Sequence, residues 1–183
     1  TSNLNSDLTL SGSATIDVAQ EKTLTYGGAA LSLGANTLTI AGAGTLSNPS
    51  GYVLGDPSSI LKLSGTNTVS GPIALTSGTL DIDEDSAISG AIVQGGSASI
   101  DVAQGKTLTY SGTAISLGEY TLTLTGGGTL SNTNSLTLGN ASSVLNVTGP
   151  NTVSGPIDLT SGTLDIDEDS AVSGDIAQGG SAS

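Results

Sequence analysis

The chain has 183 residues, contains no Cys, Met, Trp, Phe or His, and carries a formal net charge of −13. This charge excludes nucleic-acid binding, which needs cationic side chains to neutralise phosphates, and it opposes attachment to an anionic membrane. The lack of Cys excludes a disulfide framework and a thiolate zinc site. No apolar run is long enough to span a bilayer, so we expect no direct membrane insertion. Since 36% of the residues are apolar and most of these are aliphatic, the chain can still bury a core.

The dominant feature of the sequence is an internal repeat of about 84 residues. The segment 77–87, for example, recurs unchanged at 161–171. We therefore divide the chain into two superrepeats, 16–99 and 100–183, preceded by a partial coil at 1–15. Because the whole chain follows one continuous pattern without capping repeats, we expect a single domain that is an excerpt from a longer array.

A shorter period divides each superrepeat into four units of about 19–23 residues. Each unit holds about three short segments of alternating apolar and polar residues, such as 37–40, 44–47 and 51–55, separated by Gly, Asn, Ser or Pro. The main strand of successive units begins its apolar pattern at Ile16, Leu38, Leu61, Leu80, Ile100, Leu122, Leu145 and Leu164. Three strands and three corners per unit are typical of one coil of a three-sided β-helix.

We therefore predict an all-β fold, a parallel three-sided β-solenoid of about eight coils, right-handed as parallel crossovers usually are. Coils about 4.8 Å apart would build a rod of roughly 40 Å. We expect Leu122 to point inward and to stack between Ile100 and Leu145. Two tandem immunoglobulin-like sandwiches are the alternative, but the short period and the absence of a linker or a large core aromatic argue against them.

Two stretches, 63–82 and 147–166, contain Asn-Thr-Val-Ser-Gly-Pro-Ile followed by Ser-Gly-Thr-Leu-Asp-Ile. They resemble the β-strand repeat of autotransporter passengers, in which an Asn-Thr-aromatic-Ser/Thr-Gly core precedes a Gly-Thr-Leu strand; Val69 and Val153 stand at the aromatic position here. The whole chain is more loosely similar to filamentous-haemagglutinin-type bacterial adhesins. The resemblance implies a secreted right-handed β-helix that displays or supports adhesive regions away from the cell.

Acidic runs in each superrepeat offer the main candidates for a metal site. They consist of Asp81, Asp83 and Asp85 and of their copies Asp165, Asp167 and Asp169. Their alternating carboxylates could supply oxygens to Ca²⁺, but the spacing matches neither an EF-hand nor the calcium-binding nonapeptide. A solvated acidic edge that keeps the rod soluble is the simpler interpretation, so we assign no metal or cofactor and leave calcium open.

An enzymatic role is not expected. Aligned coils would place Asp81 directly against Asp101, about 5 Å apart, which resembles the carboxyl spacing of retaining glycosidases. The chain has no Arg or His to bind an acidic sugar or move a proton, and Ser has no His to activate it. Paired outward threonines such as Thr37 and Thr39 resemble ice-binding arrays, but the neighbouring coil would carry Ile60 and Lys62 beside them.

The sequence thus favours a structural rod or spacer segment of a secreted, repetitive bacterial cell-surface adhesin or extracellular fibre. Its expected partners are neighbouring repeats of the same longer chain or fibre, and a host or matrix glycan or protein. An adhesive module that binds a glycan or protein through an exposed Thr/Asn/Asp sheet is the alternative. A fragment of a polysaccharide-active β-helix enzyme is a further one.

Overall fold

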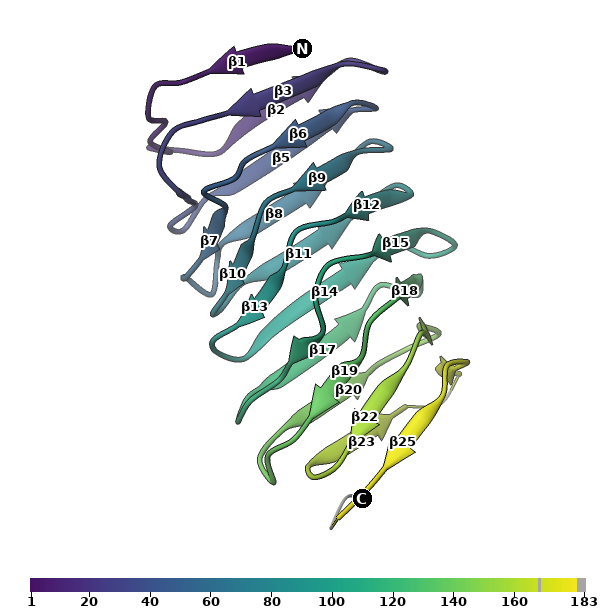
Figure 1. Ribbon diagram of the computed structural model, residues 1–183. Coiled ribbons are helices and arrows are strands. Elements are labelled where there is room, and N and C mark those ends of the chain that lie inside the picture. The colour runs from purple at the N-terminus through teal and green to yellow at the C-terminus, as the bar shows by residue number, and fades with distance from the viewer. Residues whose placement is uncertain (168, 181–183) are drawn as a thin grey trace.

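The computed structural model describes residues 1–167 and 169–180, which form a stack of coils with the two termini at opposite ends (Figure 1). The strands run parallel and form an all-β solenoid of about eight turns, which confirms the fold class predicted from the repeat. Each full coil contributes one strand to each of three faces, here called A, B and C. In the described part of the chain there is no helix with the length and apolar character needed to cross a membrane.

Face A is a nine-stranded sheet of β1 (Ser2–Leu4), β3 (Thr23–Tyr26), β6 (Thr45–Ser47), β9 (Thr68–Ser70), β12 (Ser86–Ile88), β15 (Thr107–Tyr110), β18 (Thr129–Asn132), β21 (Thr152–Ser154) and β24 (Ala171–Val172). Face B is an eight-stranded sheet of β2 (Ala14–Val18), β5 (Thr37–Gly42), β8 (Ile60–Leu63), β11 (Thr79–Ile82), β14 (Ala98–Val102), β17 (Thr121–Thr125), β20 (Val144–Val147) and β23 (Thr163–Ile166). Face C consists of two four-stranded sheets. The first contains β4 (Leu31–Ser32), β7 (Tyr52–Leu54), β10 (Ile73–Leu75) and β13 (Ile92–Gln94), and the second β16 (Ile115–Ser116), β19 (Leu136–Leu138), β22 (Ile157–Leu159) and β25 (Ile176–Gln178).

Alternation along each strand decides which side chains enter the interior. In β8, Leu61 and Leu63 are fully buried, whereas Lys62 between them lies on the outer surface. Parallel pairing then places Leu61 beside Leu80, and Leu80 beside Ile100, so that apolar side chains stack in columns along the rod. Each fully buried aliphatic side chain contributes about 1.5–3 kcal/mol of transfer free energy, and the interior is therefore the main source of stability.

One of the two neighbours predicted for Leu122 was wrong. Leu122 is buried and stacks on Leu145 as expected, but its other neighbour is Ala98, while Ile100 pairs with Leu124. The register from β14 to β17 is thus displaced by two residues from the one predicted. Such a shift keeps every side chain on the same face of the sheet, and the apolar pattern alone therefore does not distinguish the two registers.

The corners are closed by glycines and asparagines that link one coil to the next. A Cβ atom on Gly90 would lie 1.8 Å from the carbonyl oxygen of Gly71, so no other residue fits at this corner. The buried amide of Asn67 donates 2.9 Å hydrogen bonds to the carbonyls of Ile40 and Gly65, and its copy Asn151 accepts from the backbone of Gly127 and Gly128. The asparagine of the autotransporter-like motif is therefore a corner residue that holds coils together.

A buried tyrosine lies at the break between the two sheets of face C. The Tyr110 hydroxyl accepts a 3.0 Å hydrogen bond from the backbone N–H of Ile92 in β13 and donates a 2.7 Å bond to the carbonyl of Thr113. One superrepeat earlier, the Tyr26 hydroxyl accepts from the N–H of Leu8 in the same way. The phenol thus supplies the acceptor that a neighbouring strand would otherwise provide.

Candidate functional site

Residues 81–85, here called the acidic corner, comprise the end of β11 on face B and the turn that leads to β12 on face A. Asp81 stacks against Asp101 of the following coil, as the alignment of coils predicted. On its other side Asp81 stacks against Lys62 of the preceding coil. One of the three cationic side chains of the chain therefore lies beside the first of its two acidic runs.

Lys62 forms two ion pairs within the acidic corner. Its Nζ lies 2.8 Å from Asp81 Oδ2 and 2.6 Å from Asp83 Oδ2, while its side chain keeps 30% of its surface exposed. Partial burial lowers the pKa of Lys62, but hydrogen bonds and attraction from Asp81 and Asp83 outweigh this and leave the pKa raised. The sequence analysis missed this contact, although Asp81 follows Lys62 along the chain by one short coil.

The far side of the acidic corner is bound to the following coil. Lys106 Nζ lies 2.5 Å from Glu84 Oε2, and the hydrogen bond to this carboxylate raises the pKa of the ammonium group. Asp85 Oδ1 accepts a 2.8 Å hydrogen bond from the backbone N–H of Thr107. The carboxylates of the first run therefore already serve as bridges between coils, which is a structural role.

The second acidic run has a different environment. Asn146 takes the place of Lys62 beside Asp165, and its buried Oδ1 atom has no hydrogen-bond partner. Asp167 and Asp169 lie on the exposed turn that follows. Glu168, between them, is not among the described residues. Among the residues described, no three His, Cys, Asp or Glu side chains gather closely enough to hold a metal ion. Calcium binding by either run stays an untested hypothesis.

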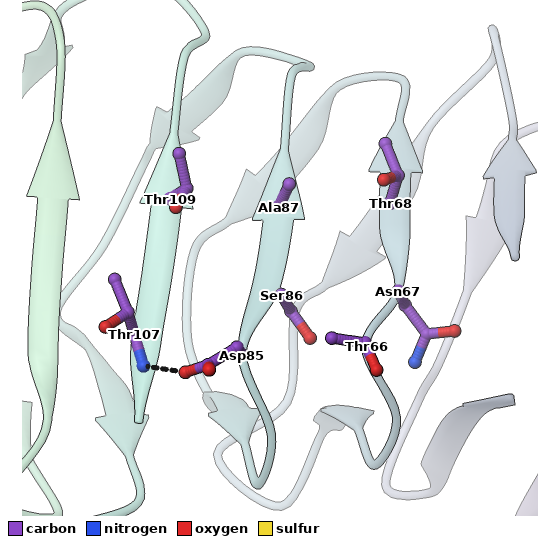
Figure 2. Close-up of a pocket in the computed structure, with 8 residues that line it drawn as sticks. All are labelled: Thr66, Asn67, Thr68, Asp85, Ser86, Ala87, Thr107 and Thr109. Atoms are coloured by element: carbon purple, nitrogen blue, oxygen red, sulfur yellow. Dashed lines mark hydrogen bonds between the residues drawn. The ribbon is translucent and has the colours of Figure 1, made fainter. Parts of the chain in front are cut away.

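Face A carries a shallow groove of about 410 Å³ that crosses three strands (Figure 2). It is lined by Thr66, Asn67, Thr68, Asp85, Ser86, Ala87, Thr107 and Thr109. Figure 2 shows Thr109, Ala87 and Thr68 side by side, and the strand register pairs Ala87 with both threonines. The groove therefore arises because one small side chain replaces a hydroxyl residue between two threonines.

The groove is open to solvent along its length and offers mainly hydroxyl groups, with Asp85 as the one ionisable side chain in its lining. At its edge, Asp85 is bonded to Thr107, and the Ser86 hydroxyl donates a 2.8 Å hydrogen bond to the carbonyl of Gly65. The remaining threonine side chains lie over the sheet. Such a surface can contact an extended or flat partner, but it does not enclose a small molecule.

Comparison with known proteins does not narrow the assignment further. The chain matches no known family model, no curated protein and no solved structure. The β-solenoid and its repeats are compatible with a structural repeat module, and the likeness to adhesins stays a prediction from the sequence motif.

Proposed function

We propose that this chain is a structural rod or spacer segment of a secreted, repetitive bacterial cell-surface adhesin or extracellular fibre. The observation that carries this proposal is the unbroken stacking of coils on faces A and B from one end of the described chain to the other. A surface that recurs with each superrepeat has no unique cleft, whereas it can set a distance between whatever lies at its two ends.

The links between coils support a rod that keeps its shape. Backbone hydrogen bonds between parallel strands join each coil to the next. The buried corner asparagines Asn67 and Asn151, and the ion pairs of Lys62 and Lys106, add side-chain links between neighbouring coils. All of these bonds cross between coils and so oppose separation of the turns. The acidic exterior adds repulsion between separate rods, which favours solubility in an extracellular setting.

The rod hypothesis is tested by joining two copies of the chain in register, with residue 16 of the second copy following Ser183 of the first. Because residue 16 begins the superrepeat again, the fused chain is expected to continue the solenoid without a joint. Small-angle scattering should then show an unchanged cross-section and a maximum dimension that grows by about 4.8 Å per added coil.

A matched fusion that starts the second copy at residue 27, within a coil, provides the control. It has nearly the same length and composition but breaks the register, so its scattering should show two rods about a flexible joint. Equal scattering profiles from the two fusions would contradict the rod. Labelling of the parent protein on intact cells tests the surface location separately.

A further inference from the structure

Two tripeptides of the second superrepeat match the acceptor sequence, or sequon, for N-linked glycans, Asn-x-Ser/Thr in which x is not Pro. They are Asn140-Ala-Ser142 and Asn146-Val-Thr148. A third tripeptide, 48–50, has Pro at its middle position and is excluded. Because such short matches arise easily in a chain rich in Asn, Ser and Thr, the sequence does not show which of them can react. A transferase must reach the side-chain amide from solvent, so the structure decides between them.

Asn140 lies at an exposed corner of the rod. It belongs to the turn between β19 on face C and β20 on face B, and residues 139–142 are all exposed to solvent (Figure 1). The Asn140 Oδ1 atom accepts a 2.8 Å hydrogen bond from the backbone N–H of Ser142. Within the described chain, the Asn140 Nδ2 group and the Ser142 hydroxyl form no hydrogen bond. The reactive nitrogen and the hydroxyl of this sequon are therefore both available to an enzyme.

The turn that carries Asn140 is fixed to the rod by a buried serine. Ser143 is fully buried, and its Oγ atom accepts a 3.2 Å hydrogen bond from the backbone N–H of Asn140. The same hydroxyl donates to the carbonyl of Gly118 in the preceding coil. The backbone N–H of Ser143 donates a further 2.9 Å bond to the Asn140 carbonyl. The folded chain therefore holds the acceptor in a defined position, and no core side chain has to move when a sugar is attached.

Asn146, in contrast, lies within a sheet. It belongs to β20, where it pairs with Thr123 on one side and with Asp165 on the other. Its Oδ1 atom is buried, and the Thr148 hydroxyl of the same sequon donates a 3.1 Å hydrogen bond to the carbonyl of Leu124. A transferase can bind this sequon only after β20 has separated from its neighbours, which breaks the backbone hydrogen bonds of the sheet.

We propose that Asn140 is the acceptor for an N-linked glycan and that Asn146 is not. The donor is a sugar activated as a phosphate ester at C1, such as a nucleotide diphosphate sugar. The Asn140 Nδ2 atom attacks C1, the bond from C1 to the phosphate oxygen breaks, and the phosphate leaves with the electron pair. The Nδ2 proton passes to a base of the transferase. The product carries a bulky, hydrated group on one edge of the rod, whether the rod is a spacer or an adhesive module.

The first superrepeat offers the same corner without an acceptor. Asp56 stands at the position of Asn140, and its Oδ1 atom accepts a 2.8 Å hydrogen bond from the backbone N–H of Ser58. The backbone N–H of Asp56 donates a 3.1 Å bond to the Ser59 hydroxyl, as that of Asn140 does to Ser143. Since Pro57 follows, Asp56→Asn alone would not create a sequon. Asp56→Asn combined with Pro57→Ala would create one in a turn with the same hydrogen bonds.

The test incubates the folded chain with UDP-glucose and a purified enzyme that transfers glucose to Asn-x-Ser/Thr sequons, and maps the modified sites by mass spectrometry. A peptide of residues 136–150, which contains both sequons without the fold, is the reference. Both asparagines should react in the peptide. In the folded chain Asn140 should react at least about tenfold faster than Asn146, because β20 must open before Asn146 can react. Asn140→Gln or Ser142→Ala should remove nearly all of the modification, and Asn146→Gln should leave it unchanged.

The corner of the first superrepeat provides a gain of modification as a second readout. The double variant Asp56→Asn/Pro57→Ala should accept a second sugar, whereas Asp56→Asn alone should not, and thermal unfolding checks that each variant keeps the fold. The parent protein, isolated from the cells that produce it, should carry a glycan at Asn140. Three results would overturn the proposal: an unmodified Asn140 in the folded chain when the peptide reacts, equal modification of Asn140 and Asn146 in the folded chain, or a parent protein without a glycan at Asn140.

Discussion

The two superrepeats share an apolar interior but differ on the outside and at several core positions. Lys62 of the first superrepeat corresponds to Asn146 of the second, and Tyr52 corresponds to Leu136. Despite these changes, β8 and β11 pair in the same register as their copies β20 and β23. The inward aliphatic columns and the corner residues therefore maintain the coil geometry, whereas the outward charges can change without altering it.

The interior should respond equally in both superrepeats, and here the largest effect is expected. Leu38 and its copy Leu122 are each 1% exposed. Leu38→Asp and Leu122→Asp should each lower the free energy of unfolding by more than about 3 kcal/mol, because each buries an unpaired charge. Urea denaturation of both variants provides the measurement.

The outward neighbour Thr121 is the control for this pair. Thr121→Asp should change the free energy of unfolding by less than about 0.5 kcal/mol, since its side chain remains in water. Similar unfolding midpoints for Leu122→Asp and Thr121→Asp would contradict the assigned direction of the side chains.

Two of the buried tyrosines, Tyr110 and Tyr52, should behave differently. Tyr110→Phe removes the acceptor of the Ile92 N–H and leaves this buried group unpaired, which should cost about 1–3 kcal/mol. The buried hydroxyl of Tyr52 has no partner, so Tyr52→Phe should leave the free energy of unfolding unchanged or raise it. Thermal unfolding of the two variants side by side tests this contrast, and a larger loss for Tyr52→Phe would refute it.

The same residues predict loss of stability in alkali. Burial raises the pKa of Tyr52 and of Tyr110 above the ordinary value of 10.0. A group whose pKa is raised by folding contributes stability that is complete below its unfolded pKa and is lost as the pH rises toward its folded pKa. The urea midpoint should therefore be level below pH 10 and fall above it.

Lys62 adds to this loss, since its pKa is also raised above the ordinary value of 10.5. Tyr52→Phe should make the alkaline decline shallower, because the phenylalanine cannot titrate. A decline of equal slope in the variant and in the unaltered chain would show that Tyr52 does not take part.

Exchange of the outward residues should produce the smallest effect. Asn146→Lys introduces into the second superrepeat the cation that the first one has, and Lys62→Asn does the reverse. Because these ion pairs are partly exposed, we expect a gain of up to about 1 kcal/mol for the first variant and a similar loss for the second. The difference should shrink in concentrated NaCl, where exposed charges are screened. If both variants changed the free energy of unfolding in the same direction, positions 62 and 146 would not be equivalent.

Sequence alone sufficed for the all-β solenoid, its coil length and the direction of most side chains. Alternation of apolar and polar residues decides which side of a strand faces inward, and the short period of each coil leaves room for three strands and three corners. The stacking of Asp81 on Asp101 also followed from counting along the repeat. These features depend on local pattern and on the repetition of that pattern.

Other features were decided by tertiary structure, because they depend on which coils meet and in which register. Ile100 pairs with Leu124 rather than with Leu122, since a shift by two residues leaves the apolar pattern intact and corner packing makes the choice. The ion pairs from Lys62 to Asp81 and Asp83 likewise join residues that lie about one coil apart along the chain. A sequence pattern gives each residue its side of the strand, but only the stacked coils determine its neighbours.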